Sequence, residues 1–168
     1  DVMAHLMDIM ETAYTCIDTC MGVKEGEKTL VIVDRTCLDY GEAFCSAAIL
    51  KGARPAIMVM PEPRPYDKEP SELAIAGMRA ADVVVTAFSL PVMSNQFIHT
   101  KALKDALDRG LRFGLFQPPA PGTRAASAKE LLETRDRAAR LAERMTQAAS
   151  ARVTTALGTD VTVSLMGR

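Results

Sequence analysis

One uninterrupted apolar stretch, Thr29-Leu30-Val31-Ile32-Val33, decides the fold. A strand with one face in water alternates apolar and polar residues, whereas a continuous apolar run is typical of a strand buried on both faces. The stretch is too short for a helix, and three of its five side chains are β-branched Val or Ile. It therefore predicts a strand in the middle of a sheet, with other elements packed against both of its faces.

Outward from this stretch, predicted strands and helices alternate along the chain. Further strands are predicted at residues 55–60, 82–88 and 111–116. Helices are predicted at 1–21, at 39–51, from a cap at Ser71, from the loop around Pro91 to Arg109, and at 127–149. Such alternation calls for right-handed β-α-β crossovers. The predicted fold class is α/β, a three-layer doubly wound, mostly parallel sheet with helices on both faces and a C-terminal β-hairpin.

The hairpin is predicted from two alternating runs near the C-terminus. The first run is Val153, Thr155 and Leu157, the turn is Gly158-Thr159, and the second run is Val161, Val163 and Leu165. We place this hairpin at one edge of the sheet. Because an isolated hairpin is only marginally stable in water and its open edge invites pairing, we expect the polypeptide to continue beyond Arg168.

The composition of the chain argues against binding to nucleic acid or to a membrane. The chain has 168 residues, 48% of them hydrophobic and 24% charged, with a net charge of −1. A near-neutral chain with 5% aromatic residues is not expected to bind nucleic acid or an acidic membrane surface. The sequence has no run of about 18 apolar residues, so it predicts no membrane-spanning helix. Cys16, Cys20, Cys37 and Cys45 form no C-x-x-C pair and are interpreted as semi-buried thiols of a cytoplasmic protein.

Several catalytic signatures are missing from the sequence. There is no G-x-S-x-G elbow, no phosphate-binding G-x-x-x-x-G-K-[ST] loop, and no G-x-G-x-x-G after the first strand. His5 and His99 are the only histidines, and no H-E-x-x-H or H-x-H pattern is present. No catalytic residue and no metal ligand is therefore assigned within the chain.

Polar residues follow the predicted strands, where ligands bind in open parallel sheets. Asp34-Arg35-Thr36 follows the first strand, Pro61-Glu62 the second, Ser89 the third and Gln117 the fourth. Asp34 with Arg35 is the best polar cluster. One interpretation makes it a substrate or subunit contact; the other makes Asp34 a cap of the loop that enters the next helix, with Arg35 solvated.

His99-Thr100 is a second candidate. Thr100 is interpreted as the N-cap of the following helix, with His99 at the edge of the sheet, and a substrate contact is the alternative. The candidate substrate-binding set is Asp34, Arg35, Thr36, Ser89, His99 and Thr100.

Three local patterns carry a family resemblance. They are Val23-Lys24-Glu25-Gly26-Glu27 before the first strand, His99-Thr100-Lys101-Ala102 with Gly110-Leu111-Arg112 after its helix, and Gly158-Thr159-Asp160-Val161-Thr162-Val163-Ser164-Leu165-Met166-Gly167-Arg168. In this order and spacing the chain resembles the aminopeptidase T-like ("leucyl aminopeptidase") metallopeptidases, to which 2,5-dihydroxypyridine 5,6-dioxygenase is related. Met166 departs from the pattern, because members of that family often carry an acidic residue there.

The resemblance implies a larger enzyme. Residues 1–168 would be a single α/β domain, the N-terminal domain of a two-domain protein whose metal ligands lie in the C-terminal domain. The implied cofactor of the parent protein is a divalent metal, Zn, Co or Mn in a peptidase and Fe in a dioxygenase, with none bound by this segment. The expected partners are a small-molecule or peptide substrate and further copies of the chain, in the cytoplasm.

Three functions stay open from the sequence. The first is the α/β domain of a metal-dependent aminopeptidase-like hydrolase, which shapes the cleft and supports oligomerisation. The second is the corresponding domain of a non-haem iron dioxygenase that opens a dihydroxypyridine ring. The third is a non-catalytic domain that binds a small molecule or mediates assembly. The form His-Thr-Lys-Ala at 99–102 favours the peptidase branch over the dioxygenase branch.

Overall fold

The computed structural model describes residues 9–61, 69–89, 97–118 and 126–167. Two compact units make up the chain, Asp1–Ser127 and Ala128–Arg168, and each is described by itself. The first unit holds the parallel sheet and its helices, and the second holds one helix and the hairpin. The prediction that 1–168 is one domain of a longer enzyme stays a prediction.

The sheet of the first unit has four parallel strands in the order β2-β1-β3-β4. Their bounds are β1 (Lys28–Asp34), β2 (Arg54–Met60), β3 (Val83–Ala87) and β4 (Arg112–Phe116). In the register, Val31 of β1 lies opposite Ile57 of β2 on one side and Val85 of β3 on the other. All four strands were predicted, and the order 2-1-3-4 is a doubly wound one.

Both faces of β1 are buried, as its sequence predicts. Val31 and Val33 belong to one apolar cluster, whereas Leu30 and Ile32 belong to another on the opposite face. Three of these four side chains are completely inaccessible to solvent. Full burial of a Val, Leu or Ile side chain contributes about 1.5–3 kcal/mol, so β1 is the strand on which the two cores of this unit depend.

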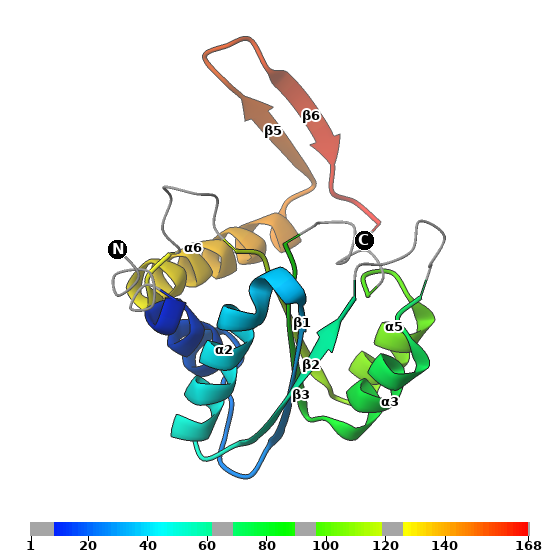
Figure 1. The fold of residues 1–168 in the computed structure, drawn as a ribbon. Helices are drawn as coiled ribbons and strands as arrows, with labels where there is room; N and C mark the ends of the chain where they lie inside the picture. The colour runs from blue at the N-terminus through cyan, green and yellow to red at the C-terminus, as the bar shows by residue number, and fades with distance from the viewer. Residues whose placement is uncertain (1–8, 62–68, 90–96, 119–125, 168) are drawn as a thin grey trace. The chain divides into compact units, whose positions relative to one another are not determined.

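Helices cover both faces of the sheet. α2 (Leu38–Leu50) lies on one face, and α3 (Glu72–Ala80) and α5 (Lys101–Asp108) lie together on the other (Figure 1). The buried residues agree, because Phe44 of α2 packs with Val31, whereas Met78 of α3 and Ala106 of α5 pack with Ile32. The predicted three-layer α/β architecture is thereby confirmed.

Local signals in the sequence set the helix ends. The hydroxyl of Ser71 accepts a hydrogen bond from the backbone nitrogen of Ala74 at the start of α3. Gly52 follows α2 with φ of +75°, a left-handed conformation that glycine adopts without strain. Both ends were predicted from these residues.

The first predicted helix differs from the structure in its last turns. Residues 1–8 lie outside the described part, residues 9–14 are α-helical, and η1 (Thr15–Cys20) is π-helical. The backbone nitrogen of Met21 donates to the carbonyl of Cys16, a bond across five residues that accommodates one extra residue in the turn. Apolar spacing alone does not reveal this, because α- and π-helical turns present similar faces.

The second unit consists of α6 (Ala128–Gln147), β5 (Ser150–Thr154) and β6 (Asp160–Ser164). β5 and β6 pair antiparallel and form a two-stranded sheet of their own, so the predicted C-terminal hairpin is confirmed. Its placement at one edge of the parallel sheet stays a prediction. The predicted strand through Leu157 is too long. Thr155 and Thr159 bond across a turn at 155–159, which takes Leu157 out of the strand and leaves it 99% exposed.

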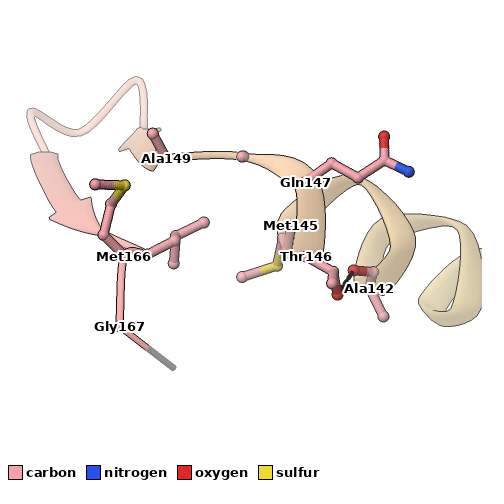
Figure 2. A pocket seen from close by; sticks show the side chains of 9 residues that line it. Ala142, Met145, Thr146, Gln147, Ala149, Met166 and Gly167 are labelled. Carbon is pink, nitrogen blue, oxygen red and sulfur yellow. Dashed lines mark hydrogen bonds between the residues drawn. The ribbon is translucent and has the colours of Figure 1, made fainter.

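A shallow pocket of about 570 Å³ lies within the second unit. Figure 2 shows Ala142, Met145 and Thr146 of α6 on one side of it and Met166 with Gly167 on the other. The backbone nitrogen of Leu165 donates to the carbonyl of Ala149, which ties the end of the hairpin to the residues that follow α6. In the described ranges, no helix is long and apolar enough to cross a membrane.

Candidate functional site

The strand order creates a switch point between β1 and β3. The connection from β1 runs to β2, whereas the connection from β3 runs to β4 on the far side of the sheet. The loops that leave the carboxyl ends of these two neighbouring strands therefore diverge, and open α/β sheets bind ligands in the crevice at such a point. Asp34 is the last residue of β1 and Ser89 follows β3, so two of the candidate residues lie at this junction.

Asp34 caps the turn that follows β1. It is the N-cap of η2 (Arg35–Cys37), and its Oδ1 accepts hydrogen bonds from the backbone nitrogens of Thr36 at 2.8 Å and Cys37 at 2.9 Å. The side chain is only 3% exposed. A buried carboxylate is stable only with such partners, and short polar side chains at N-cap positions supply acceptors for backbone N–H groups that have no helical partner.

Asp34 also binds the loop that follows β3. Its Oδ2 accepts a hydrogen bond from the backbone nitrogen of Ser89 at 2.6 Å and another from the Ser89 hydroxyl at 2.7 Å. Both oxygens of one buried carboxylate are therefore occupied, one by each of the two loops at the switch point. We name the pair of Asp34 and Ser89 the β1–β3 clasp.

The clasp holds a negative charge. Burial opposes ionisation of Asp34, but the hydrogen bonds donated by Ser89 and Cys37 together outweigh burial and hold the pKa of this carboxyl below its ordinary value of 3.8. Burial, followed by the charge of Asp34, raises the pKa of the Cys37 thiol to about 12. At neutral pH the site thus contains an Asp34 carboxylate beside a protonated, unreactive thiol.

Exposed polar side chains surround the buried carboxylate. Arg35, Thr36 and Ser89 are all exposed, and each is either bonded to Asp34 or next to it in the chain. Because all its acceptor sites face internal donors, Asp34 is suited to positioning rather than to proton transfer. Ser89 still offers hydroxyl lone pairs, and Arg35 offers a guanidinium that is able to bind an anionic oxygen in bidentate geometry.

The other candidate pair, His99 and Thr100, lies at the start of α5. The hydroxyl of Thr100 donates to the carbonyl of Phe97 at 2.8 Å and accepts from the backbone nitrogen of Leu103 at 3.2 Å, which makes it the N-cap of α5. His99 is exposed and has φ of +69°, a left-handed conformation in which histidine is enriched. Among the described residues, no hydrogen bond joins His99 or Thr100 to the clasp.

The described residues that follow β2 and β4 add no buried polar group to this site. Pro61 after β2 and Gln117 after β4 are exposed, and Glu62 lies outside the described residues. The bond between Asp34 and Ser89 was not predicted, although both residues were. The signal that points to it is the strand order: once β1 and β3 are neighbours, the residues that follow them meet.

The donor groups of the described residues do not form a metal site. Within 9–61, 69–89, 97–118 and 126–167, no three His, Cys, Asp or Glu side chains lie close enough together to hold a metal ion. The carboxylate of Asp34 is committed to N–H and O–H donors, which leaves no acceptor free for a cation. The described residues therefore do not fit the divalent metal that the resemblance implies.

A second cavity of about 500 Å³ lies at the opposite, amino end of the sheet. An ion pair between Arg112 and Glu27 lines it, and Arg112 also donates to the carbonyls of Met21 and Gly22. Arg79 and Arg109 contribute further positive charge. They lie at the C-terminal ends of α3 and α5, where basic side chains complement the helix dipoles. The positive charge of this cavity therefore has a structural role and does not by itself indicate a ligand site.

The chain is similar to one known family and to two solved structures. Residues 8–168 match the family of 2,5-dihydroxypyridine 5,6-dioxygenase. The fold is similar to the 2,5-dihydroxypyridine dioxygenase of Pseudomonas putida KT2440, with a TM-score of 0.63 and 19% identity over 92% of this chain and 46% of that one. It is also similar to wild-type AmpT, an aminopeptidase T, of Thermus thermophilus, with a TM-score of 0.61 and 14% identity over 94% and 53% of the two chains.

Both solved relatives are longer than this chain. This chain spans about half the length of either solved structure. No curated protein sequence matches it. At such identities the two structures establish the fold, and both relatives expected from the sequence are found.

Proposed function

The chain belongs to the family of 2,5-dihydroxypyridine 5,6-dioxygenase, and from this premise we propose that it is the α/β domain of a metal-dependent enzyme whose substrate meets the carboxyl ends of β1 and β3. The observation that carries the proposal is the β1–β3 clasp, which lies at the switch point where doubly wound sheets bind ligands. In the longer enzyme, this domain shapes one wall of the cleft and supports oligomerisation.

Ring-cleaving dioxygenation is the reaction we propose first. The family match runs over residues 8–168 and so includes every described element of the domain. A hydroxypyridine substrate has acidic ring hydroxyls. The exposed guanidinium of Arg35 suits a deprotonated ring hydroxyl, which is an oxyanion. The hydroxyl of Ser89 donates to Asp34 and keeps lone pairs that accept a hydrogen bond from a protonated ring hydroxyl.

Aminopeptidase activity is the second candidate. Its support is the likeness to AmpT, which has nearly the same TM-score as the likeness to the dioxygenase, together with the sequence pattern at 99–102. A peptide substrate presents a carboxylate and backbone carbonyls, for which Arg35 and Ser89 are equally suitable partners. The two candidates share the site and differ in the reaction.

Asp34 acts as a positioning residue in either reaction. It keeps Ser89 and the turn that begins with Arg35 at a fixed separation, because one carboxylate receives bonds from both loops. The proposed divalent metal is Fe in the dioxygenase and Zn, Co or Mn in the peptidase, held by residues other than those described. A homo-oligomer in the cytoplasm, acting on a small molecule or peptide, completes the proposal.

Paired assays on one preparation separate the candidates. The protein expressed from its natural reading frame is stripped of metal and reloaded with Fe²⁺, Zn²⁺, Co²⁺ or Mn²⁺. Oxygen uptake with 2,5-dihydroxypyridine is measured beside hydrolysis of leucine p-nitroanilide. The first proposal expects oxygen uptake with Fe²⁺ only. Peptide hydrolysis without oxygen uptake would establish the aminopeptidase. If neither activity is detected, the non-catalytic function that the sequence also allows is the one that remains.

A further inference from the structure

The cavity of about 500 Å³ at the amino end of the sheet carries an excess of positive charge. Among the residues that the structure describes, four basic and two acidic side chains line it, in a chain whose net charge is −1. They are Lys28, Arg79, Arg109 and Arg112 with Glu27 and Asp82. The excess is therefore local to this space, which we name the amino-end cavity.

Both acidic side chains of the cavity have donors of their own. Glu27 forms an ion pair with Arg112, and Asp82 accepts a hydrogen bond from the backbone nitrogen of Lys28 at 2.9 Å. The guanidinium of Arg112 also donates to two backbone carbonyls before β1, so it holds the wall of the cavity together. This pairing leaves the charges of the other basic side chains uncompensated.

Arg79 and Arg109 converge from two helices. Arg79 lies in the last turn of α3 and Arg109 is the C-cap of α5, and these helices lie together on one face of the sheet (Figure 1). The hydrogen bond from Lys101 lowers the pKa of Asp105 most, and the charges of Lys101, Arg109 and Arg79 lower it further. Asp105 is bonded to Lys101 at 2.6 Å, and within the described ranges neither guanidinium has a hydrogen bond or an ion pair of its own.

The helix dipoles do not account for this convergence. A basic residue in the last turn complements the dipole of its own helix, whichever way its side chain points. The last carbonyls of α5 are also paired already, because Ala106 and Leu107 accept hydrogen bonds from the backbone nitrogens of Leu111 and Gly110. The ammonium of Lys28 lines the same cavity and likewise has no partner in the described part of the chain. Like charges gathered in this way repel one another, and a bound anion would offset that cost.

We propose that the amino-end cavity is a binding site for a phosphate group, held by the guanidiniums of Arg79 and Arg109 and the ammonium of Lys28. A guanidinium donates two parallel hydrogen bonds to an oxyanion, and an ammonium acts as a compact point charge. The tetrahedral oxygens of phosphate accept hydrogen bonds from several directions, as donors from two helices and a strand require. A volume of about 500 Å³ is within the range of small-molecule sites, so a small phosphate monoester has room as well as the free ion.

This site is separate from the proposed substrate site. Lys28 begins β1 and Asp34 ends it, so the length of this strand, about 20 Å, separates the amino-end cavity from the β1–β3 clasp. The phosphate is therefore not the substrate of the proposed reaction. Its binding is expected without the metal, and it is independent of which reaction the enzyme catalyses.

Isothermal titration calorimetry with inorganic phosphate tests the site. The naturally expressed protein, stripped of metal, is titrated at about pH 7.5 and low ionic strength, and we expect a Kd of about 0.1 to 1 mM. R79Q and R109Q each remove one charged fork and should raise the Kd about tenfold. K104Q removes an exposed charge from the same helix, α5, outside the cavity, and is the matched control that should bind like the wild type.

Two further ligands define the chemistry. Succinate carries two carboxylates in place of the phosphate group, and we expect it to bind about tenfold more weakly or worse. Glycerol phosphate separates the two sources of a phosphate group. Tighter binding than inorganic phosphate assigns the cavity to a phosphate monoester, whereas equal or weaker binding assigns it to the free ion.

Thermal unfolding followed by circular dichroism provides a second measurement and shows that each variant is folded. The melting temperature of the wild type should rise with phosphate concentration, and that of the double variant R79Q/R109Q should not, because only a bound ligand stabilises the folded state in this way. A wild-type Kd above about 10 mM would overturn the proposal. R79Q and R109Q that bind like the wild type, a K104Q that weakens binding as much as they do, or succinate that binds as tightly as phosphate would also overturn it.

Discussion

Oδ2 of Asp34 accepts two hydrogen bonds from Ser89, one from its backbone nitrogen at 2.6 Å and one from its hydroxyl at 2.7 Å. The two residues are 55 positions apart in the chain, and they meet because β1 and β3 are neighbours in the sheet. The same carboxylate caps η2 through its other oxygen. One side chain thus fixes both loops of the switch point.

Replacing Asp34 by Asn should lower the free energy of unfolding by about 2–3 kcal/mol, because hydrogen bonds to a charged acceptor are lost and an amide N–H₂ group faces the N–H of Ser89 or Thr36. Urea unfolding followed by circular dichroism measures the change. D108N, an exposed carboxylate at the end of α5, is the matched control and should stay within about 0.5 kcal/mol of the wild type. Equal stabilities of D34N and D108N would contradict the clasp.

The clasp should also make stability depend on pH. Because the pKa of Asp34 is lower in the folded state than its ordinary value of 3.8, the folded protein binds fewer protons, and stability rises with pH in this range. The contribution is complete above about pH 5 and is lost as the pH falls through the folded-state pKa. Urea unfolding at a series of pH values should show a steeper acid loss for the wild type than for D34N. Parallel curves would show that Asp34 keeps an ordinary pKa.

The cysteines should differ in reactivity. Cys37 is 2% exposed with its pKa raised to about 12, first by burial and then by Asp34, whereas Cys20 is exposed. We expect iodoacetamide at pH 8 to modify Cys20 about tenfold or more faster than Cys37, because the thiolate is the reactive form and must be accessible. Mass spectrometry of the digested protein gives both rates. In denaturant the rates should converge, and equal rates in the folded state would exclude the described packing around Cys37.

Thr100 should contribute as a helix cap rather than through its chemistry. T100A removes the acceptor for Leu103 and the donor to Phe97, and should lower the free energy of unfolding by about 1 kcal/mol. T100S keeps the hydroxyl and should retain most of that stability. Thermal unfolding of the two variants provides the comparison, and a T100S as unstable as T100A would assign the effect to the lost methyl group instead.

Local patterns in the sequence predicted the central strand and several helix ends. The apolar run before Asp34 identified the central strand, and Ser71, Thr100 and Gly52 identified helix ends, because capping and glycine conformations depend on a few neighbouring residues. The contact between Asp34 and Ser89 depends on strand order, which no local pattern contains. The hairpin was predicted, but its first strand, β5, ends at Thr154, because hydrogen bonds within the turn replace the strand alternation that reaches Leu157.

The most direct test of the proposed site compares two arginines at opposite ends of the sheet. Arg35 follows β1 at the switch point, and Arg54 begins β2 at the amino end; both are exposed. Steady-state oxygen uptake with 2,5-dihydroxypyridine is measured for the Fe²⁺-loaded natural protein and for R35A and R54A. We predict that R35A raises KM about tenfold, from the loss of one charged contact, while R54A leaves it unchanged. Equal KM values for R35A and the wild type would contradict a substrate site at the carboxyl ends of β1 and β3.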